Sequence, residues 1–333
     1  MEVITHAALG ALISELALGQ RMGYRAAIWG AVAGLLPELE YLIRPIYGEF
    51  TFLLERRGLL HSVWGLILIP VLLSFLARGW SRSRFPDLRK RDWWKVFAWI
   101  WVFHLGLDAS TTLGIQFFYP FWKYRVSLNM IASFDVLLTL ILILFLSLSL
   151  RLPSHHRRRS LWSGIGLTLF GLYMIVAFTN WQTVRSVFAN SCQEAGHRPL
   201  RYEVYPIWGS NLYWYGIGEE GYSYQVGYYS LLNGLDGRFL LQYLPKEHSL
   251  PPYGFSHYLE DRMQEATHRY YNVETRGDTL IWYDLRWGWS QLSDSAEKEP
   301  WVSYRLLLKE GQPPTWISQE GPPFFWEEHR GER

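Results

Sequence analysis

The stretch SFDVLLTLILILFLSLSL, residues 133–150, carries one charged side chain, Asp135, in eighteen positions. A run this long and apolar is typical of a membrane helix, because the hydrocarbon core requires about 20 residues in helical form. Similar runs precede and follow it and together predict about six transmembrane helices, at 3–19, 26–43, 59–77, 96–119, 129–150 and 161–184. The first two runs are short and rich in small residues, so a buried soluble helix or a re-entrant segment is the alternative there.

The composition of the chain changes near residue 184. Residues 185–333 contain 15 of the 21 tyrosines and several short strand-like runs separated by Gly, Asp and Pro. This pattern predicts a small antiparallel β-sheet with one helix near 256–270. We therefore predict an α-helical transmembrane bundle over 1–184, which includes the metal site, followed by a small β-rich extracytoplasmic domain over 185–333. Cys192 is the single cysteine and excludes an intramolecular disulfide.

Basic residues distinguish the two sides of the predicted bundle. The connections 20–25, 78–95 and 151–160 together hold 13 Lys and Arg residues, whereas 44–58 and 120–128 hold five. Because short cytoplasmic loops are enriched in Lys and Arg, the first set predicts the cytoplasmic side. The N-terminus and the β-rich domain are then extracytoplasmic, as expected for a multi-pass protein of the inner, or plasma, membrane.

Nearly every ionisable side chain inside the apolar runs is a possible metal ligand. Such groups are costly within a membrane, so their presence indicates a functional site. In the predicted topology they all lie towards the outer leaflet: His6, Glu38, Glu40, His61, His104, Asp108 and Asp135. Imidazole and carboxylate groups are the ligands of zinc and similar divalent ions. We predict a site for zinc or, as the alternative, manganese, with these ligands: His6, Glu38, His61, His104, Asp108 and Asp135.

Two short motifs supply most of the predicted ligands. In HLGLD, a spacing of four places His104 and Asp108 on one helix face, one turn apart. The alternative for this pair is a buried polar duo without a metal. In PELE, two helical glutamates would point about 200° apart, so Glu38 and Glu40 would have different roles. One of them would bind the metal, while the other orients a histidine or accepts a proton.

Two further residues have equally weighted alternatives. Arg57 lies in RRGLLHS, where a helix start and a guanidinium could hold an anionic group. An arginine at the membrane interface is the alternative. Asp135 opens the apolar run at 133–150 and is either a metal ligand or the N-cap of that helix.

The order of the motifs resembles a known family. The sequence has THAALG, an acidic pair after Pro37, RG-x-x-HS, H-x-x-x-D-A-S-T, a Pro-Phe dipeptide and an Asp that opens the next helix. This order is similar to the YdjM-like family of membrane-bound metal-dependent hydrolases, and that family is distantly similar to zinc-dependent phospholipase C and the P1-type nucleases. The resemblance implies metal ligands at these positions: His6, His61, His104 and Asp108.

The chain also departs from the family pattern. Glu38 and Glu40 stand where the family usually has aspartates, and longer side chains would bind with shifted geometry. Arg56 and Leu60 replace a His and a Thr of the pattern HRG-x-T-H-S. The missing His removes a possible ligand, so the resemblance implies a single-metal site here rather than a multi-metal centre.

These observations predict a membrane-embedded metal-dependent hydrolase. Its substrate would be a membrane lipid or a lipid-linked phosphoester at the outer leaflet, with Glu38 or Glu40 as base and Arg57 holding the anionic group. One alternative is an ion or metal transporter, although Glu15 is the main polar residue in the cytoplasmic half of the bundle. Another is a non-catalytic scaffold in which the metal only holds the helical bundle together. No phosphate-binding loop or nucleic-acid motif occurs, so we expect no nucleic acid partner.

Overall fold

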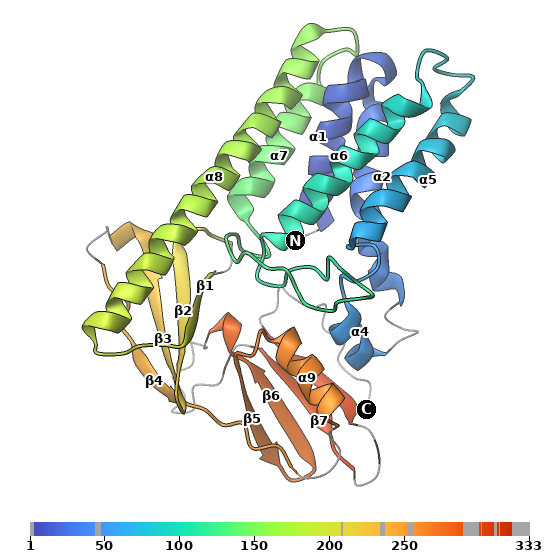
Figure 1. The fold of residues 1–333 in the computed structure, drawn as a ribbon. Helices are drawn as coiled ribbons and strands as arrows, with labels where there is room; N and C mark the ends of the chain where they lie inside the picture. The colour runs from blue at the N-terminus through green and yellow to red at the C-terminus, as the bar shows by residue number, and fades with distance from the viewer. Residues whose placement is uncertain are drawn as a thin grey trace. The chain divides into compact units, whose positions relative to one another are not determined.

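The structure is a computed structural model that describes residues 3–43, 48–207, 209–233, 237–251, 256–288, 300, 302–309, 312 and 314–321. The chain divides into two compact units. The first unit consists of Met1–Arg44, Glu55–Thr183 and Pro206–Leu212, and the second of Pro45–Leu54, Val184–Tyr205 and Tyr213–Arg333. The first unit is helical, whereas the second contains the β-sheets (Figure 1).

The first unit is a helical bundle arranged around its N-terminal helix. Its long helices are α1 (Val3–Met22), α2 (Tyr24–Leu35), α5 (Val63–Ser81), α6 (Lys90–Ala109), α7 (Val136–Leu150) and the part of α8 (Arg157–Glu194) up to Thr183. Helix α1 packs against α2, α6 and α7, and α5 packs against α6. Most of α1 is buried, including Leu9, Leu12 and Leu18, because apolar side chains occur all around this helix. The first half of the chain is therefore helical, as the sequence predicts.

Glycines let the first two helices approach to backbone contact. A Cβ atom added at Gly10 would lie 2.3 Å from the Gly30 carbonyl oxygen, and one at Gly34 would lie 2.4 Å from the His6 carbonyl oxygen. Only glycine fits at such a distance, as in other close helix crossings. The end of α2 therefore lies against the beginning of α1. The chain then continues directly into the 3-10 helix η1 (Leu36–Ile43).

Three helices of the described chain are long and apolar enough to cross a membrane, namely α1, α5 and α8. Helix α7 is apolar but has only 15 residues. Several large apolar side chains on α5 face outward, among them Ile67, Leu68 and Leu72. An exposed apolar stripe of this kind is expected where a helix contacts lipid. The structure thus contains candidate spans, and the total of six spans stays a prediction.

Several predicted helix boundaries differ from the structure. The helix predicted over 161–184 extends as α8 from Arg157 to Glu194, ten residues into the part predicted to be β-rich. The helix predicted over 96–119 ends at Ala109, and Gly114 follows with a φ of 62° in a loop closed by a bridge between Ile115 and Val126. The helix predicted over 129–150 begins only at Val136. The run predicted over 26–43 changes to a 3-10 helix at Leu36, one residue before Pro37. Local turn chemistry, rather than hydropathy, sets these ends.

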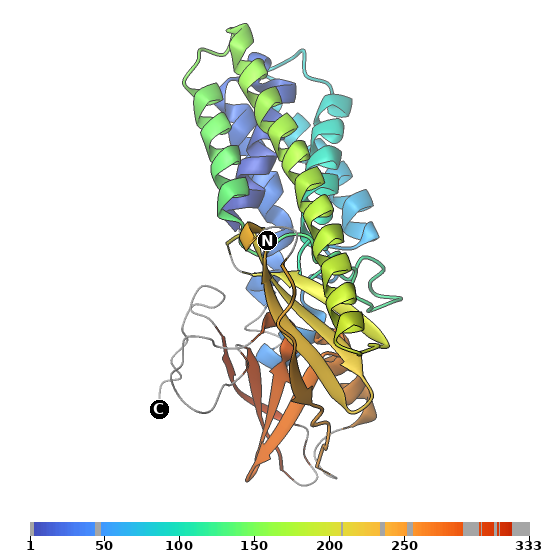
Figure 2. The same ribbon diagram turned by 90° about the vertical axis from the view of Figure 1, so that its left-hand side faces the viewer.

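The second unit contains two antiparallel four-stranded sheets rather than the single sheet predicted. One sheet has the order β1 (Arg201–Pro206), β2 (Tyr213–Glu220), β3 (Ser223–Ser230) and β4 (Gln242–Pro245). The other has β5 (Tyr271–Arg276), β6 (Thr279–Asp284), β7 (Ser303–Leu307) and β8 (Thr315–Glu320). Figure 2 shows them in yellow and orange tones. In each sheet the order of the strands follows their order in the chain.

Short helices accompany the second sheet. Helix α9 (His257–Ala266) lies within the helix predicted near 256–270, and it packs on the sheet through Met263 and Ala266. Helix α4 (Glu49–Glu55) adds Leu54 to the same core, and the Leu54 carbonyl accepts a 2.7 Å hydrogen bond from Arg262. The short 3-10 helices are η2 (Leu231–Asn233) and η3 (Leu285–Trp287). Aromatic side chains such as Trp282 contribute to this core.

Candidate metal centre

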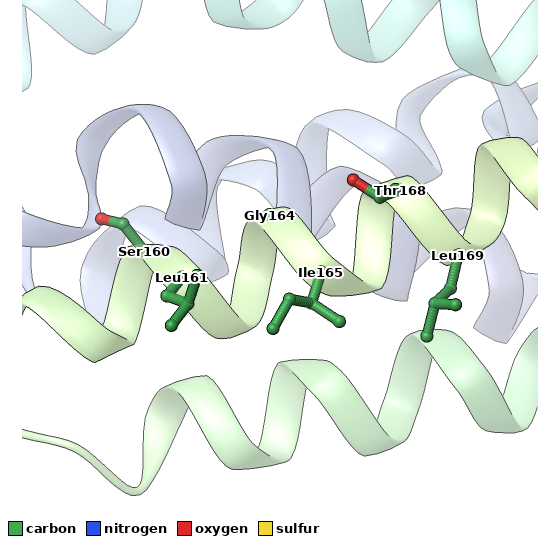
Figure 3. A pocket seen from close by; sticks show the side chains of 6 residues that line it. All are labelled: Ser160, Leu161, Gly164, Ile165, Thr168 and Leu169. Carbon is green, nitrogen blue, oxygen red and sulfur yellow. The ribbon is translucent and has the colours of Figure 1, made fainter.

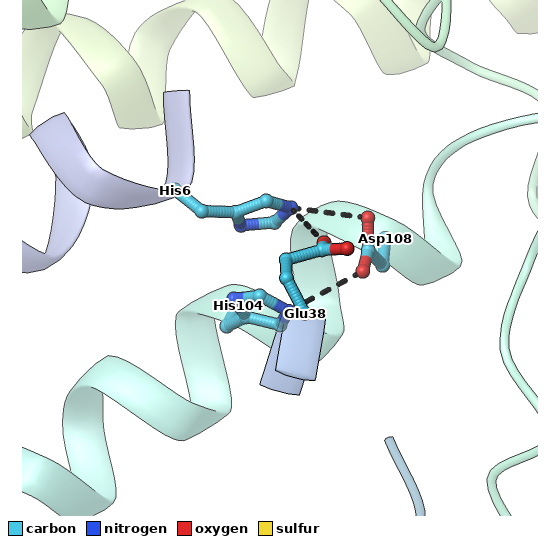
Figure 4. A group of neighbouring side chains, drawn as sticks. All are labelled: His6, Glu38, His104 and Asp108. Atoms are coloured by element: carbon cyan, nitrogen blue, oxygen red, sulfur yellow. Dashed lines mark hydrogen bonds and ion pairs between the residues drawn. The ribbon is translucent and has the colours of Figure 1, made fainter. Parts of the chain in front are cut away.

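Four predicted ligands meet at one end of the helical unit. His6 lies on the first turns of α1, Glu38 on η1, and His104 and Asp108 on the last turns of α6. Each offers a ligand atom, and all four atoms lie within 4.8 Å of one another (Figure 4). His6, His104 and Asp108 are 0–1% exposed, and Glu38 is 9% exposed. The i, i+4 spacing of HLGLD brings its two side chains together, as predicted.

The distances between these atoms are those of ligands around one ion. His6 Nε2 lies 3.2 Å from Asp108 Oδ1 and 3.8 Å from Glu38 Oε1. His104 Nε2 lies 3.4 Å from Asp108 Oδ2. Metal bonds of about 2.0–2.2 Å in a tetrahedral arrangement separate neighbouring ligand atoms by roughly 3.4 Å. The spacing of the group therefore fits a divalent ion of zinc size.

An unsatisfied oxygen gives a second test of that fit. Among the described residues, Glu38 Oε1 is buried without a hydrogen-bond partner. Its 3.8 Å separation from His6 Nε2 is too long for a hydrogen bond. A buried carboxylate oxygen without a partner is costly, whereas a bound cation would satisfy it. The donor set is also right, because imidazoles and carboxylates together suit zinc or manganese.

His61 adjoins the group and is held by Glu40. Its Nε2 lies 3.3 Å from Asp108 Oδ2 and 3.4 Å from His104 Nε2. Its Nδ1 lies 3.2 Å from Glu40 Oε2, and the same carboxylate accepts hydrogen bonds from the backbone N–H groups of Gly58 and Leu60. A carboxylate that binds the far nitrogen of a histidine fixes the orientation of the ring, as it does around many metal sites. Glu38 and Glu40 thus have different partners, as the PELE motif predicts.

Arg57 binds the central acid of the group. Its Nη2 lies 3.0 Å from Asp108 Oδ1, and its Nη1 donates to Thr111 Oγ1 and the Gly114 carbonyl at 3.3 Å. The side chain is 2% exposed, and the backbone φ of Arg57 is 57°, in the left-handed region. The guanidinium therefore anchors the carboxylate that three histidines share. The sequence motif predicted an anion-binding arginine and did not reveal this contact, nor the part that Thr111 has in it.

Asp135 has other partners. Its Oδ1 accepts a 3.0 Å hydrogen bond from the Leu138 N–H group, so it caps the beginning of α7. Its Oδ2 accepts a hydrogen bond from the Tyr173 hydroxyl of α8. Asp135 is not one of the four clustered residues. Of its two predicted roles, capping of the helix is the one that its hydrogen bonds show.

Helix α8 also has a hollow, but its chemistry is different. The hollow is lined by the stretch Ser160–Leu169, in which Leu161, Ile165 and Leu169 supply apolar side chains (Figure 3). None of its six lining residues is titratable. It therefore offers no metal ligand or acid–base group, in contrast to the cluster on α1, η1 and α6.

The family model described as YdjM inner membrane protein matches residues 1–184, which is more than half of the chain. The chain belongs to the YdjM inner membrane protein family. The family resemblance predicted from the sequence is thereby confirmed, and the matched YdjM region includes all the clustered residues. No curated protein and no solved structure matches the chain. The distant similarity to zinc-dependent phospholipase C and the P1-type nucleases stays a prediction.

Proposed function

We propose that this YdjM-family protein is a membrane-embedded, metal-dependent hydrolase of a lipid or lipid-linked phosphoester at the outer leaflet. One observation carries the proposal, namely four buried ligand atoms within 4.8 Å of one another in an inner membrane protein family. Buried ionisable groups in membrane segments are retained for function more often than for stability.

The metal would be held by His6, His104 and Asp108, with His61 next to them. When bound, a divalent ion, zinc or manganese, supplies Lewis-acid chemistry that polarises a phosphoryl oxygen and lowers the pKa of a water. Arg57 holds Asp108 in place through the 3.0 Å contact with its Oδ1. Glu40 fixes the His61 ring through Nδ1, so that Nε2 faces the group.

Glu38 is the proposed general base. Its Oε1 lacks a hydrogen-bond partner among the described residues, so this oxygen is available either to the cation or to a proton. It also lies farther from His6 than Asp108 does, at 3.8 Å against 3.2 Å. At 9% exposed, it is the most accessible of the four clustered residues. These differences favour Glu38 as a proton acceptor at the edge of the centre, although a fourth ligand is the alternative.

The proposed topology follows the sequence. The bundle over 1–184 crosses the inner membrane about six times, and the β-rich part over 185–333 is extracytoplasmic. Candidate spans α1, α5 and α8 support a multi-pass arrangement. The transporter alternative is disfavoured by Glu15, which is bound to Arg159 through both carboxylate oxygens and so offers no free acid for an ion path. The experiments below distinguish a hydrolase from a non-catalytic scaffold in which a closed four-ligand metal site only holds the helices together.

The first experiment is metal analysis of the detergent-purified protein by mass spectrometry. We expect about one divalent ion per chain in the wild type and loss of that ion in Asp108→Asn, because this carboxylate contacts every histidine of the centre. Asp135→Asn is the matched control. It removes one carboxylate but retains an N-cap residue, so the ion should stay. Absence of metal from a folded wild type, even after reloading, would overturn the proposal.

The second experiment is turnover by the metal-loaded protein. Substrates are phospholipid vesicles, a polyprenyl phosphate and a chromogenic phosphoester. Glu38→Gln should retain the metal and lose at least about 100-fold in rate, because a general base contributes about that much. Loss of the metal in Glu38→Gln would instead identify Glu38 as a ligand and favour the non-catalytic scaffold. No turnover of any of these substrates by the metal-loaded wild type contradicts the hydrolase.

A further inference from the structure

The connection between α6 and α7 carries an exposed aromatic tip. It consists of Phe121, Trp122, Lys123 and Tyr124, in the order FWKY. Phe121 is 79% exposed, Trp122 is 70% exposed and Tyr124 is 69% exposed. Three neighbouring large aromatic side chains with this exposure mark a surface that contacts something other than water.

The tip continues the apolar face of a candidate membrane span. The ring of Phe121 lies 6.3 Å from that of Trp64, at the beginning of α5. Beyond Trp64, α5 exposes Leu68 and Leu72, which lie on its outward stripe. A span in an inner membrane protein presents such a stripe to lipid, and the tip lies at the end of that stripe.

The composition of the tip is that of the membrane interface. Trp and Tyr are enriched at the level of the lipid headgroups, where their apolar rings are buried and their N–H and O–H groups stay wet. Lys123 adds a charge, and its Nζ lies 2.6 Å from Glu55 Oε1, so the tip is also polar. We propose that residues 118–124 form an interfacial anchor that lies among the lipid headgroups.

The residues directly before the anchor are hydrogen-bonded to the segment that carries His61. The Gln116 N–H group donates a 3.0 Å hydrogen bond to the Arg57 carbonyl, and the Val63 N–H group donates a 2.9 Å hydrogen bond to the Phe117 carbonyl. These two bonds lie on either side of His61 in the sequence. The depth of the anchor in the membrane therefore fixes the depth of the centre. The centre then lies at the level of the lipid phosphates, so that the phosphoester group of a lipid is within reach of it.

This inference does not depend on hydrolysis, and spin-label depth measurement tests it separately. The native Cys192 is buried and free, so Cys192→Ala provides a background without other thiols. Single labels are placed by Trp122→Cys in the anchor and Leu59→Cys beside His61, both at exposed positions. Leu72→Cys on α5 is the reference within the span, and Tyr222→Cys, 93% exposed in the second unit, is the reference in water.

The labelled proteins are reconstituted in phosphatidylethanolamine and phosphatidylglycerol vesicles, and collision with oxygen and with a nickel chelate gives the depth. We expect labels 122 and 59 at the same depth, about 15–20 Å from the bilayer centre. Label 72 should be deeper, because eight residues separate it from Trp64, about 12 Å along a helix.

Each other outcome overturns the anchor. If the label at 122 is as accessible to the nickel chelate as the label at 222, the tip lies in water. Label 122 as deep as label 72 would put it in the hydrocarbon core. Label 122 shielded from both collision partners would mean that protein, such as a second copy of the chain, covers it. A label 59 at a different depth from label 122 would overturn the link to the metal centre.

Discussion

Two buried charged clusters lie on α1, and they differ in how completely their atoms are paired. Glu15 and Arg159 form the first, at 0% and 4% exposed. The Arg159 guanidinium donates to both Glu15 carboxylate oxygens and, through Nη1, to the Leu152 carbonyl at 2.9 Å. Its charges balance, one negative against one positive. This cluster is closed and requires no further ligand.

The second cluster, around His6, is not paired in this way. Its three carboxylates, those of Glu38, Glu40 and Asp108, contact histidines, and Arg57 pairs with Asp108. Glu38 Oε1 is without a hydrogen-bond partner in the described part of the chain. A divalent cation would satisfy this oxygen. A structural ion pair is thus complete in itself, whereas a binding site leaves atoms for its ligand.

The largest expected effect comes from breaking the closed cluster. Arg159→Met should cost about 3–5 kcal/mol of stability, because it leaves Glu15 buried as an uncompensated charge. The measurement is the thermal unfolding midpoint in detergent, together with metal content per folded chain, which should not change. The double variant Glu15→Leu/Arg159→Met is the control and should recover most of the loss, since two apolar groups replace the pair. An unaltered midpoint in Arg159→Met would show that the ion pair does not hold α1 to α8.

A chelator should act only on the open cluster. At free metal of about 100 times the dissociation constant, bound metal adds about 2.7 kcal/mol to the stability. Removing it should lower the unfolding midpoint of the wild type and of Arg159→Met alike. Asp108→Asn should show no response to chelator, because it has no metal to lose. The effect should also vanish at acid pH, since the ligands must be deprotonated to bind. An equal chelator response in Asp108→Asn would contradict the site.

The sequence predicts the helical bundle and all four clustered residues for a simple reason. Apolar runs and an i, i+4 pair are local signals, and α1, α6 and the HLGLD motif follow from them. The roles of Glu38 and Glu40 could not be assigned from sequence. In the 3-10 helix that they occupy, two residues correspond to about 240° of rotation, so one faces His6 and the other faces His61.

The remaining differences arise from contacts between distant segments. Arg57 adopts a positive φ and reaches Asp108, 51 positions away, which no local pattern indicates. The single sheet predicted for the second half was wrong because strand runs reveal strands but not their partners. Strands β4, β5 and β8 complete the two separate sheets that the chain forms. Pairing depends on register and on the other strands present.

The smallest expected effect tests how the open cluster is held together. Gly34→Ala would place a Cβ atom 2.4 Å from the His6 carbonyl oxygen, so α1 and α2 must separate. We expect a loss of about 1–3 kcal/mol in stability, as for other overpacked sites, and weaker metal binding because His6 moves away from Glu38. Gly106→Ala is the matched control within HLGLD. Its Cβ would meet nothing within 4 Å, so metal binding should persist and stability should rise by up to about 1 kcal/mol. If titration with zinc gives both variants the wild-type affinity, the α1–α2 crossing does not set the position of His6, and α6 alone organises the centre.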